Sequence, residues 1–245
     1  MHVLVTRPEP DALKLKGQLE ARGHAASVEP LHAASYDDGE DFDLDGVTGL
    51  IVTSRHALLV LEQVPELLKE ARQLTVFAVG AATARTARQM GFRTVVKGPG
   101  TAADLVPAIA SAVDPTDDML LYLSGERTAI DIGAELGALG FHVTTAKVYS
   151  MEPRESLTGR TRELIGDGDL EGVLLMSGEA ATVWVQLVQK HHLGTAVRLL
   201  NHFCLSDGIA KRLGPLGSIP ISVAHGPTVE ELLALIDAAG AQLDC

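Results

Sequence analysis

The stretch GLIVTSRHA at residues 49–57 decides the fold class, and a near copy of it, GVLLMSGEA, occupies residues 172–180. Each stretch begins with a glycine and an unbroken apolar run, and each then reaches a serine. Apolar runs without alternation are typical of strands buried on both faces of a parallel sheet. Because serine after such a run is a common N-cap, a helix is expected to follow each strand.

The same rhythm of apolar runs and helical segments extends over the chain. Helical stretches of about 10–14 residues separate most of the runs, which indicates βαβ units and parallel sheets. In the first such stretch, Ala12, Leu15 and Leu19 share one helical stripe, and Gly23 favours a C-terminal stop. Ten strands are too many for one open sheet in a chain of this length, so two five-stranded sheets are expected. The runs are VLVT (3–6), AASVEPL (25–31), GLIVTS (49–54), TVFAVG (75–80), RTVVKG (93–98), MLLYLSG (119–125), HVTTAKVYS (142–150), GVLLMS (172–177), HFCLS (202–206) and ISVAHG (221–226).

An internal repeat supports a division into two lobes. Agreement of several segments in order is what one gene duplication with small gaps leaves behind. The order is circularly shifted, so the N-terminal unit must complete its sheet with the C-terminal part of the chain. The matching pairs are 3–35 with 120–152, 49–57 with 172–180, and 101–109 with 228–236.

The predicted fold class is therefore α/β, with two flavodoxin-like lobes of five-stranded parallel sheets joined by a two-stranded linker. The acidic, turn-rich segment HAASYDDGEDFDLDG at 32–46 suits a solvated linker. Two crossings between the lobes predict a hinge and a ligand cleft between them. The expected boundaries are 1–34 with 152–245 for lobe 1, 47–147 for lobe 2, and 35–46 with 148–151 for the linker strands.

Composition and charge exclude several classes of partner. The 245 residues include 20 Lys and Arg against 32 Asp and Glu, a formal net charge of -12. A nucleic-acid binder needs a basic face that displaces counterions from phosphates, so nucleic acid is not an expected partner. No apolar run reaches the roughly 18–20 residues of a membrane span. The opening MHVLVTRPEP lacks the pattern of a secretory signal.

The two cysteines and nine histidines show no pattern of a disulfide framework or a metal site. Cys204 lies in an apolar run and Cys245 is the last residue of the sequence. The expected location is therefore a reducing cytoplasm, and we expect a monomer that acts on a small molecule. GPGTAA at 98–103 matches a dinucleotide-binding pattern only loosely, because Pro99 lacks an N–H group. We therefore expect no cofactor and no metal.

Small polar residues follow most of the apolar runs. Parallel sheets bind ligands beyond the carboxyl ends of their strands, and free N–H groups at helix starts attract anions. These residues therefore predict an anion-binding site, although each of them also suits an ordinary N-cap or turn. Arg7 either binds a carboxylate or pairs with a neighbouring acidic residue. The positions are Thr6-Arg7, Thr53-Ser54-Arg55, Gly80-Ala81-Ala82-Thr83, Ser124-Gly125-Glu126, Ser177-Gly178-Glu179 and Gly226-Pro227-Thr228.

Tyr149 lies in AKVYSMEP at 146–153, where the chain passes from one expected lobe to the other. Two roles are open for it. Its ring can pack against the linker, as amphipathic rings often do. Alternatively, its hydroxyl can face the ligand and donate a hydrogen bond to a leaving oxygen.

Six motifs, taken in order, resemble one known family. They are VLVTRPEP (3–10) with the Gly23 stop, GLIVTS (49–54), VFAVGAATA (76–84), LLYLSGER (120–127), VYSMEP (148–153) and HGPTVEEL (225–232). Their order and spacing over essentially the whole chain resemble the uroporphyrinogen-III synthase family of tetrapyrrole (heme) biosynthesis. The resemblance also implies two α/β lobes joined by a β-ladder.

The resemblance implies a cofactor-independent lyase, which takes linear hydroxymethylbilane and expels its terminal hydroxyl. The ring then closes with inversion of the last pyrrole to give uroporphyrinogen III. Every pyrrole carries an acetate and a propionate, which suits a site formed by helix N-termini. By this resemblance Tyr149 assists hydroxyl loss, and the substrate contacts are Thr53, Ser54, Ala82, Thr83, Ser124, Gly125, Ser177 and Thr228; Arg7 joins them as a candidate carboxylate ligand.

Two departures from the family pattern concern side chains near the expected site. Ile209 in SDGIAKRL (206–213) stands where the family often has a threonine, which predicts weaker binding at that corner. Arg55-His56 is bulkier than the residues common after the Thr-Ser pair.

The alternative function is a non-catalytic, two-lobe module that binds a small molecule.

Overall fold

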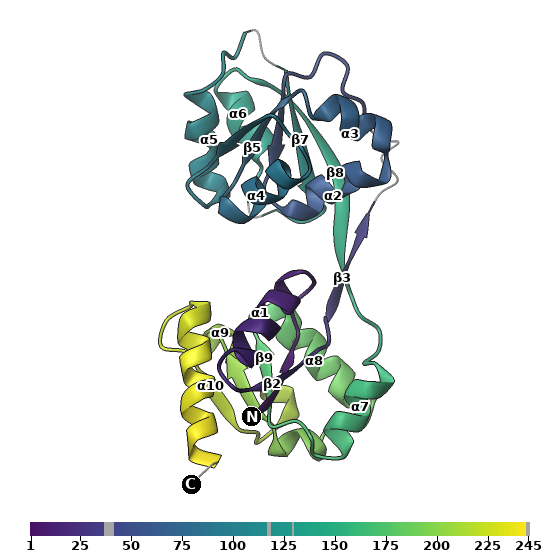
Figure 1. The fold of residues 1–245 in the computed structure, drawn as a ribbon, viewed down its shortest axis with the longest axis vertical. Helices are drawn as coiled ribbons and strands as arrows, with labels where there is room; N and C mark the ends of the chain where they lie inside the picture. The colour runs from purple at the N-terminus through teal and green to yellow at the C-terminus, as the bar shows by residue number, and fades with distance from the viewer. Residues whose placement is uncertain (37–41, 117–118, 129, 244–245) are drawn as a thin grey trace. The chain divides into compact units, whose positions relative to one another are not determined.

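The computed structural model describes residues 1–36, 42–116, 119–128 and 130–243 (Figure 1). The chain divides into two compact units. Unit 1 comprises Met1–Ala33 and Glu152–Cys245, and unit 2 comprises Ala34–Met151. Unit 1 is therefore assembled from two separate segments, whereas unit 2 is continuous in sequence.

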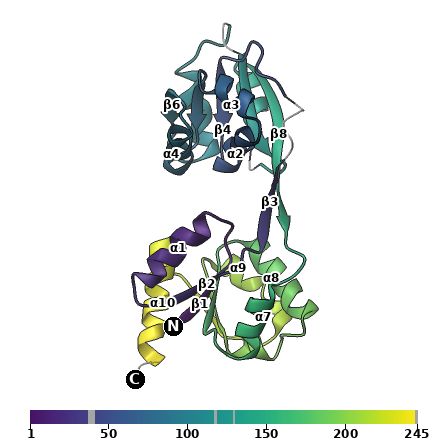
Figure 2. The same cartoon turned by 45° about the vertical axis from the view of Figure 1, so that its right-hand side comes forward.

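Unit 1 is a parallel sheet with helices on both faces (Figures 1 and 2). Its strands are β1 (His2–Val5), β2 (Ala25–Val28), β9 (Gly172–Leu175), β10 (Asn201–Cys204) and β11 (Ile221–Val223), and its helices are α1 (Asp11–Glu20), α7 (Gly159–Gly166), α8 (Gly178–Lys190), α9 (Asp207–Lys211) and α10 (Val229–Leu243), with short 3-10 turns at Ala196–Leu199 and Gly214–Leu216. The strand order is β11-β10-β9-β1-β2. Leu4 and Val173 pack with the α7–α8 side, whereas Val5 and Leu174 pack with α1 and α10. Strand residues are thus buried on both faces, which explains their continuous apolar runs.

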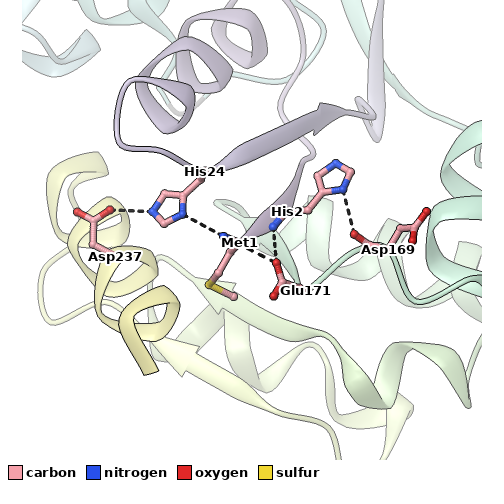
Figure 3. Close-up of polar contacts among 6 residues, drawn as sticks. All are labelled: Met1, His2, His24, Asp169, Glu171 and Asp237. Carbon is pink, nitrogen blue, oxygen red and sulfur yellow. Dashed lines mark hydrogen bonds and ion pairs between the residues drawn. The ribbon is translucent and has the colours of Figure 1, made fainter. Parts of the chain in front are cut away.

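A polar cluster ties the amino ends of β1 and β2 to neighbouring segments of unit 1 (Figure 3). The backbone N–H of His2 donates to Glu171 Oε2 at 2.6 Å, and His2 Nδ1 lies 2.9 Å from the Asp169 carbonyl oxygen. His24 Nε2 lies 2.9 Å from Asp237 Oδ1 on α10. Partial burial raises the pKa of Asp237, but the hydrogen bonds and positive charges of His24 and Arg22 together lower it by more. The pKa of Asp237 is therefore below its usual value. The cluster therefore joins the first strand to residues far along the chain.

A buried carboxylate directly after β2 stabilises the start of α7. Glu29 is 3% exposed and accepts hydrogen bonds from Thr158 N at 3.1 Å and Thr158 Oγ1 at 2.5 Å. The hydroxyl of Thr161 also donates to Glu29. Because a helix N-terminus carries partial positive charge, this position favours an anion. Glu29 thus joins the two sequence segments of unit 1.

Unit 2 is a second sheet with helices on both faces. Its strands are β3 (His32–Tyr36), β4 (Gly49–Val52), β5 (Thr75–Ala78), β6 (Thr94–Lys97), β7 (Met119–Gly125) and β8 (His142–Pro153), and its helices are α2 (Arg55–Gln63), α3 (Pro65–Ala71), α4 (Ala81–Gln89), α5 (Ala102–Ala110) and α6 (Ile132–Ala138). The strand order is β3-β8-β7-β4-β5-β6, and the strands from β8 to β6 pair in parallel. Leu50 and Val52 pack toward α2–α4, whereas Ile51 packs toward α5 and α6.

The prediction of a mixed α/β fold with parallel sheets is confirmed. Within the described residues, the sheet of unit 2 has six strands instead of the expected five, because β3 joins its edge beside β8. β8 also runs without interruption through 148–151, the range expected to form one of the two linker strands. Of the other expected linker strand, 35–46, residues 37–41 lie outside the described residues. Among the helices described, none combines the length and apolar character needed to cross a bilayer.

Candidate active site

The carboxyl ends of β4, β5 and β7 lie along one edge of the sheet of unit 2, because these strands are parallel neighbours. α2 starts directly after β4, where Ser54 is the N-cap and its Oγ accepts from His56 N at 3.2 Å. α4 starts after Gly80, and Ala81 and Ala82 in its first turn are exposed. The first N–H groups of a helix lack partners within the helix, so this edge offers donors to an anion.

A pocket of about 280 Å³ opens at this edge. It brings together three of the predicted site residues, namely Thr53, Gly125 and Tyr149. This volume lies just below the range of roughly 300–1,000 Å³ that is typical of small-molecule sites. The remaining lining residues are Val79, Gly100, Ala102, Tyr122, Arg127, Thr128 and Ile130.

Two hydroxyls face each other in this pocket. Thr53 Oγ1 lies 3.3 Å from Tyr122 Oη. Burial raises the pKa of Tyr122, and the hydrogen bond with Thr53 opposes this only in part. Tyr122 therefore stays protonated at neutral pH and keeps a hydroxyl donor in the pocket.

Tyr149 is held in the pocket by the pairing of β7 with β8. The register is irregular between Ser124 and Gly125, and this β-bulge makes Tyr149 the partner of Gly125. A Cβ on Gly125 would lie 2.7 Å from Tyr149 Cζ and 2.9 Å from its Oη. Glu126 N also donates to the Tyr149 carbonyl at 2.9 Å. A side chain at position 125 would therefore displace the phenol ring from its place across β7.

Other predicted residues of unit 2 have their side chains elsewhere. Thr83 is 5% exposed on α4. Ser124 is 1% exposed, and its hydroxyl donates to the Ala146 carbonyl at 3.3 Å. The Ala82 carbonyl accepts from Thr86 Oγ1 at 3.3 Å, and its own N–H lies in the first turn of α4. At Ala82 and Thr83 the backbone N–H groups in the first turn of α4 are therefore the groups that could reach a ligand, whereas Ser124 is a buried part of β7.

The predicted residues of unit 1 engage neighbouring groups of the same unit. Arg7 Nη2 lies 2.7 Å from Asp11 Oδ2, which matches the pairing alternative for this arginine. Both residues line a pocket of about 140 Å³ together with Lys14. Ser177 accepts from Ala180 N at 3.1 Å, and Thr228 accepts from Glu231 N at 3.2 Å, so both act as N-caps.

Tyr122 and Arg127 are among the pocket residues that sequence reasoning missed. A tyrosine inside an apolar strand needs a partner for its hydroxyl, which is a signal for Tyr122. Arg127 ends the motif LLYLSGER and follows β7 by two residues. Its position just beyond the carboxyl end of a parallel strand, where such sheets bind ligands, could have identified Arg127 as a site residue.

The described part of the chain contains neither a cluster of metal-ligating side chains nor an ionised cysteine. In the described ranges, no three His, Cys, Asp or Glu side chains gather as a metal site. Burial raises the pKa of the Cys204 thiol to about 11, so it packs in β10 as a protonated group. Cys245 lies outside the described residues.

The fold is similar to known structures over nearly the whole chain. The crystal structure of uroporphyrinogen-III synthetase from Helicobacter pylori matches with a TM-score of 0.63 and 17% identity, covering 97% of this chain and 99% of that chain. A mutant uroporphyrinogen III synthase from Thermus thermophilus matches with a TM-score of 0.51 and 17% identity, covering 100% of this chain and 99% of that chain. At these identities the likeness establishes the fold. No curated protein sequence gives a significant match.

The family follows from a match of the sequence itself. A family model described as HEM4, uroporphyrinogen-III synthase HemD, matches residues 14–234. That family is one of enzymes, cyclising lyases that require no cofactor, and the match does not favour a non-catalytic binding module. Because the match covers most of the 245 residues, the chain belongs to the uroporphyrinogen-III synthase family.

Proposed function

We propose that the pocket of unit 2 holds the reacting end of hydroxymethylbilane while the enzyme closes the ring with loss of water and inversion of the terminal pyrrole. The observation that carries the proposal is the gathering of Thr53, Tyr122, Tyr149 and Arg127 around one pocket. Hydroxyl donors suit a leaving hydroxyl, and a guanidinium suits the acetate or propionate of the ring that carries it.

Tyr149 is proposed as the donor to the leaving oxygen. Its ring lines the pocket, and its Oη is held close to the Gly125 backbone, where a Cβ would lie 2.9 Å away. Departure of hydroxide from carbon is made easier when a donor supplies a proton, so that water leaves instead. Holding the resulting cation-like azafulvene against the correct pyrrole carbon then accounts for inversion through positioning. The pyrrole carbon that forms the final bond loses its proton, which balances the proton that Tyr149 gave to the leaving oxygen.

The carboxylates of the substrate are proposed to bind both backbone and side-chain donors. In unit 2 these are the N–H group that follows Ser54 and the N–H groups of Ala82 and Thr83, all at helix starts, together with Arg127. Ser124 is proposed to lie beside the bound substrate near the carboxyl end of β7, because its buried hydroxyl is not available as a donor to the substrate. In unit 1 the proposed carboxylate contacts are Arg7, Ser177 and Thr228.

We also propose that the two units descend from one duplicated flavodoxin-like unit. When the strands of unit 1 are numbered 1 to 5 in chain order, they lie in the sheet in the order 2-1-3-4-5. Unit 2 shows the same order when β7 is counted as strand 1, β8 as strand 2, and β4, β5 and β6 as strands 3 to 5, with β3 left out. The packing supports this. A Cβ on Gly172 would lie 2.6 Å from Phe203, and a Cβ on Gly49 would lie 3.1 Å from Phe77, at equivalent places in the two sheets. The proposed lobes are 1–34 with 152–245 and 47–147.

The enzyme is proposed to act as a monomer in the cytoplasm, on a small-molecule substrate and without nucleic acid. The protonated, buried thiol of Cys204 is compatible with a reducing compartment. Sedimentation equilibrium at several protein concentrations measures the oligomeric state, and a mass twice that of the chain contradicts a monomer.

The test is turnover of enzymatically generated hydroxymethylbilane, followed by chromatographic separation of the product isomers. The wild-type chain should give uroporphyrinogen III, while an enzyme-free blank measures spontaneous closure without inversion. Tyr149→Phe keeps the ring and removes only the hydroxyl, so kcat should fall within the roughly 100–10,000-fold range of general acid catalysis. The enzymatic product should remain the inverted isomer. Wild-type turnover in a folded Phe variant refutes the role given to Tyr149.

A further inference from the structure

Tyr149 belongs to a chain of three aromatic rings that extends from the pocket to Tyr36 on β3. Tyr36 Oη lies 2.8 Å from His56 Nδ1, and the two ring centroids are 6.0 Å apart. The ring of His56 lies next to that of Tyr149, with centroids 5.6 Å apart and an interplanar angle of 35°. His56 therefore stands between Tyr36 and Tyr149, and the three residues come from α2, β3 and β8.

The backbone of His56 is fixed independently of its ring. Its N–H donates to the N-cap Ser54 at the start of α2, which places His56 in the first turn of that helix. With the backbone fixed there, the remaining freedom is rotation of the imidazole about its side-chain bonds. The hydrogen bond with Tyr36 restricts that rotation, because it requires Nδ1 to face the phenol.

Contacts from two elements therefore restrict the Tyr149 ring. Gly125 on β7 meets its Cζ and Oη end, and His56 on α2 packs against the ring itself. A catalytic hydroxyl works only when it is held in the productive geometry, and neighbouring side chains supply that hold. Tyr36 is half-buried, and burial is the largest cause of its raised pKa, so it stays protonated as a partner for His56 at neutral pH.

We infer that His56, oriented by the Tyr36 hydroxyl, is a positioning residue for Tyr149. The inference rests on the proposed donor role of Tyr149. Tyr36 and His56 act through the phenol ring, and the lining of the pocket includes Tyr149 but neither of these two residues. This assigns a function to His56, the residue whose bulk departs from the family pattern.

A double-mutant cycle measures the coupling. Tyr36→Phe removes one hydroxyl and should lower kcat by about 2-fold to 10-fold, the size expected for loss of one neutral hydrogen bond, with KM unchanged. In a Tyr149→Phe background the same change should have no further effect on kcat, because the group that it positions is gone. An equal fold-change in both backgrounds overturns the inference. Thr48→Val is the control, since it removes an exposed hydroxyl bond to the Met119 carbonyl in the same unit.

A second measurement reads the position of Tyr149 without turnover. The chain has three tyrosines, so labelling tyrosine with carbon-13 at Cζ gives three signals that single Tyr→Phe variants assign. His56→Phe keeps a ring and removes Nδ1, and it should shift the Tyr149 signal, as should Tyr36→Phe. Unmoved Tyr149 signals in both variants overturn the inference even if activity falls. If Tyr149→Phe turns over at the wild-type rate, the proposed donor role fails, and the shifts alone then decide whether the ring is positioned by His56.

Discussion

Acidification should destabilise unit 1 through one buried imidazole. His202 on β10 is fully buried, and its Nδ1 lies 3.1 Å from the carbonyl oxygens of both Leu200 and Pro220. Burial lowers the pKa of His202 from 6.5 to about 4, although these two hydrogen bonds act in the opposite direction. In the described part of the chain, His202 Nε2 has no hydrogen-bond partner, so a second ring N–H would be buried without an acceptor.

The direction and the size of this loss of stability follow from the difference in proton binding between the folded and the unfolded chain. The unfolded chain takes up a proton on His202 below pH 6.5, whereas the folded chain does so only near pH 4. Stability is therefore complete at neutral pH, falls as the pH drops from about 6.5 to about 4, and levels off below that. With these two pKa values the loss is about 2 kcal/mol at pH 5 and about 3 kcal/mol at pH 4.

Urea unfolding at pH 7 and pH 5 measures this loss. Trp184 is the chain's single tryptophan, and its ring lies 6.2 Å from that of His202, so its fluorescence reports on unit 1. Because carboxylates also titrate, the informative quantity is the difference between the wild type and His202→Val. We expect the wild type to lose about 2 kcal/mol more than this variant between the two pH values. Equal losses would falsify the argument, and His192→Asn, which removes an exposed histidine of the same unit, is the control.

The other predictions concern single contacts. Glu29→Gln should destabilise unit 1 by about 2 kcal/mol in urea unfolding, because a carboxylate that accepts from Thr158 is replaced by a neutral amide; an unchanged midpoint contradicts this. Gly125→Ala should lower kcat in a folded protein, since its Cβ displaces Tyr149, and a wild-type kcat argues against the crossing described. Arg127→Gln should raise KM about 10-fold at constant kcat, as expected for a lost charged contact, while the exposed Arg85→Gln on α4 should leave KM unchanged.

Much of the fold was accessible from the sequence because burial on both faces leaves continuous apolar runs. GLIV at 49–52 and GVLL at 172–175 form central strands of the two sheets. β3 was harder to recognise, since HAASY at 32–36 is only partly apolar and lies next to an acidic, turn-rich stretch. Its place at a sheet edge comes from pairing with β8, and pairing between distant segments leaves no local pattern.

Only part of the candidate site could be predicted from the sequence. Thr53 and Gly125 could be placed at the carboxyl edge because parallel strands end together. The contact of Tyr149 with Gly125 depends on a β-bulge, which shifts the register by one residue and is set by strand pairing. The burial of Ser124 likewise depends on which face of β7 that register assigns to it.

The discontinuous assembly of unit 1 has a consequence for synthesis. β1 is made first, yet its neighbour β9 begins at Gly172, so one side of β1 must wait for most of the chain. Unit 2 has all its strands once β8 ends at Pro153, whereas unit 1 needs β11, which ends at Val223. At about 5–20 residues per second, those roughly 70 residues delay unit 1 by roughly 4–14 s. During that interval the ribosome carries a complete unit 2 and an incomplete sheet of unit 1, whose open edge could pair with another chain.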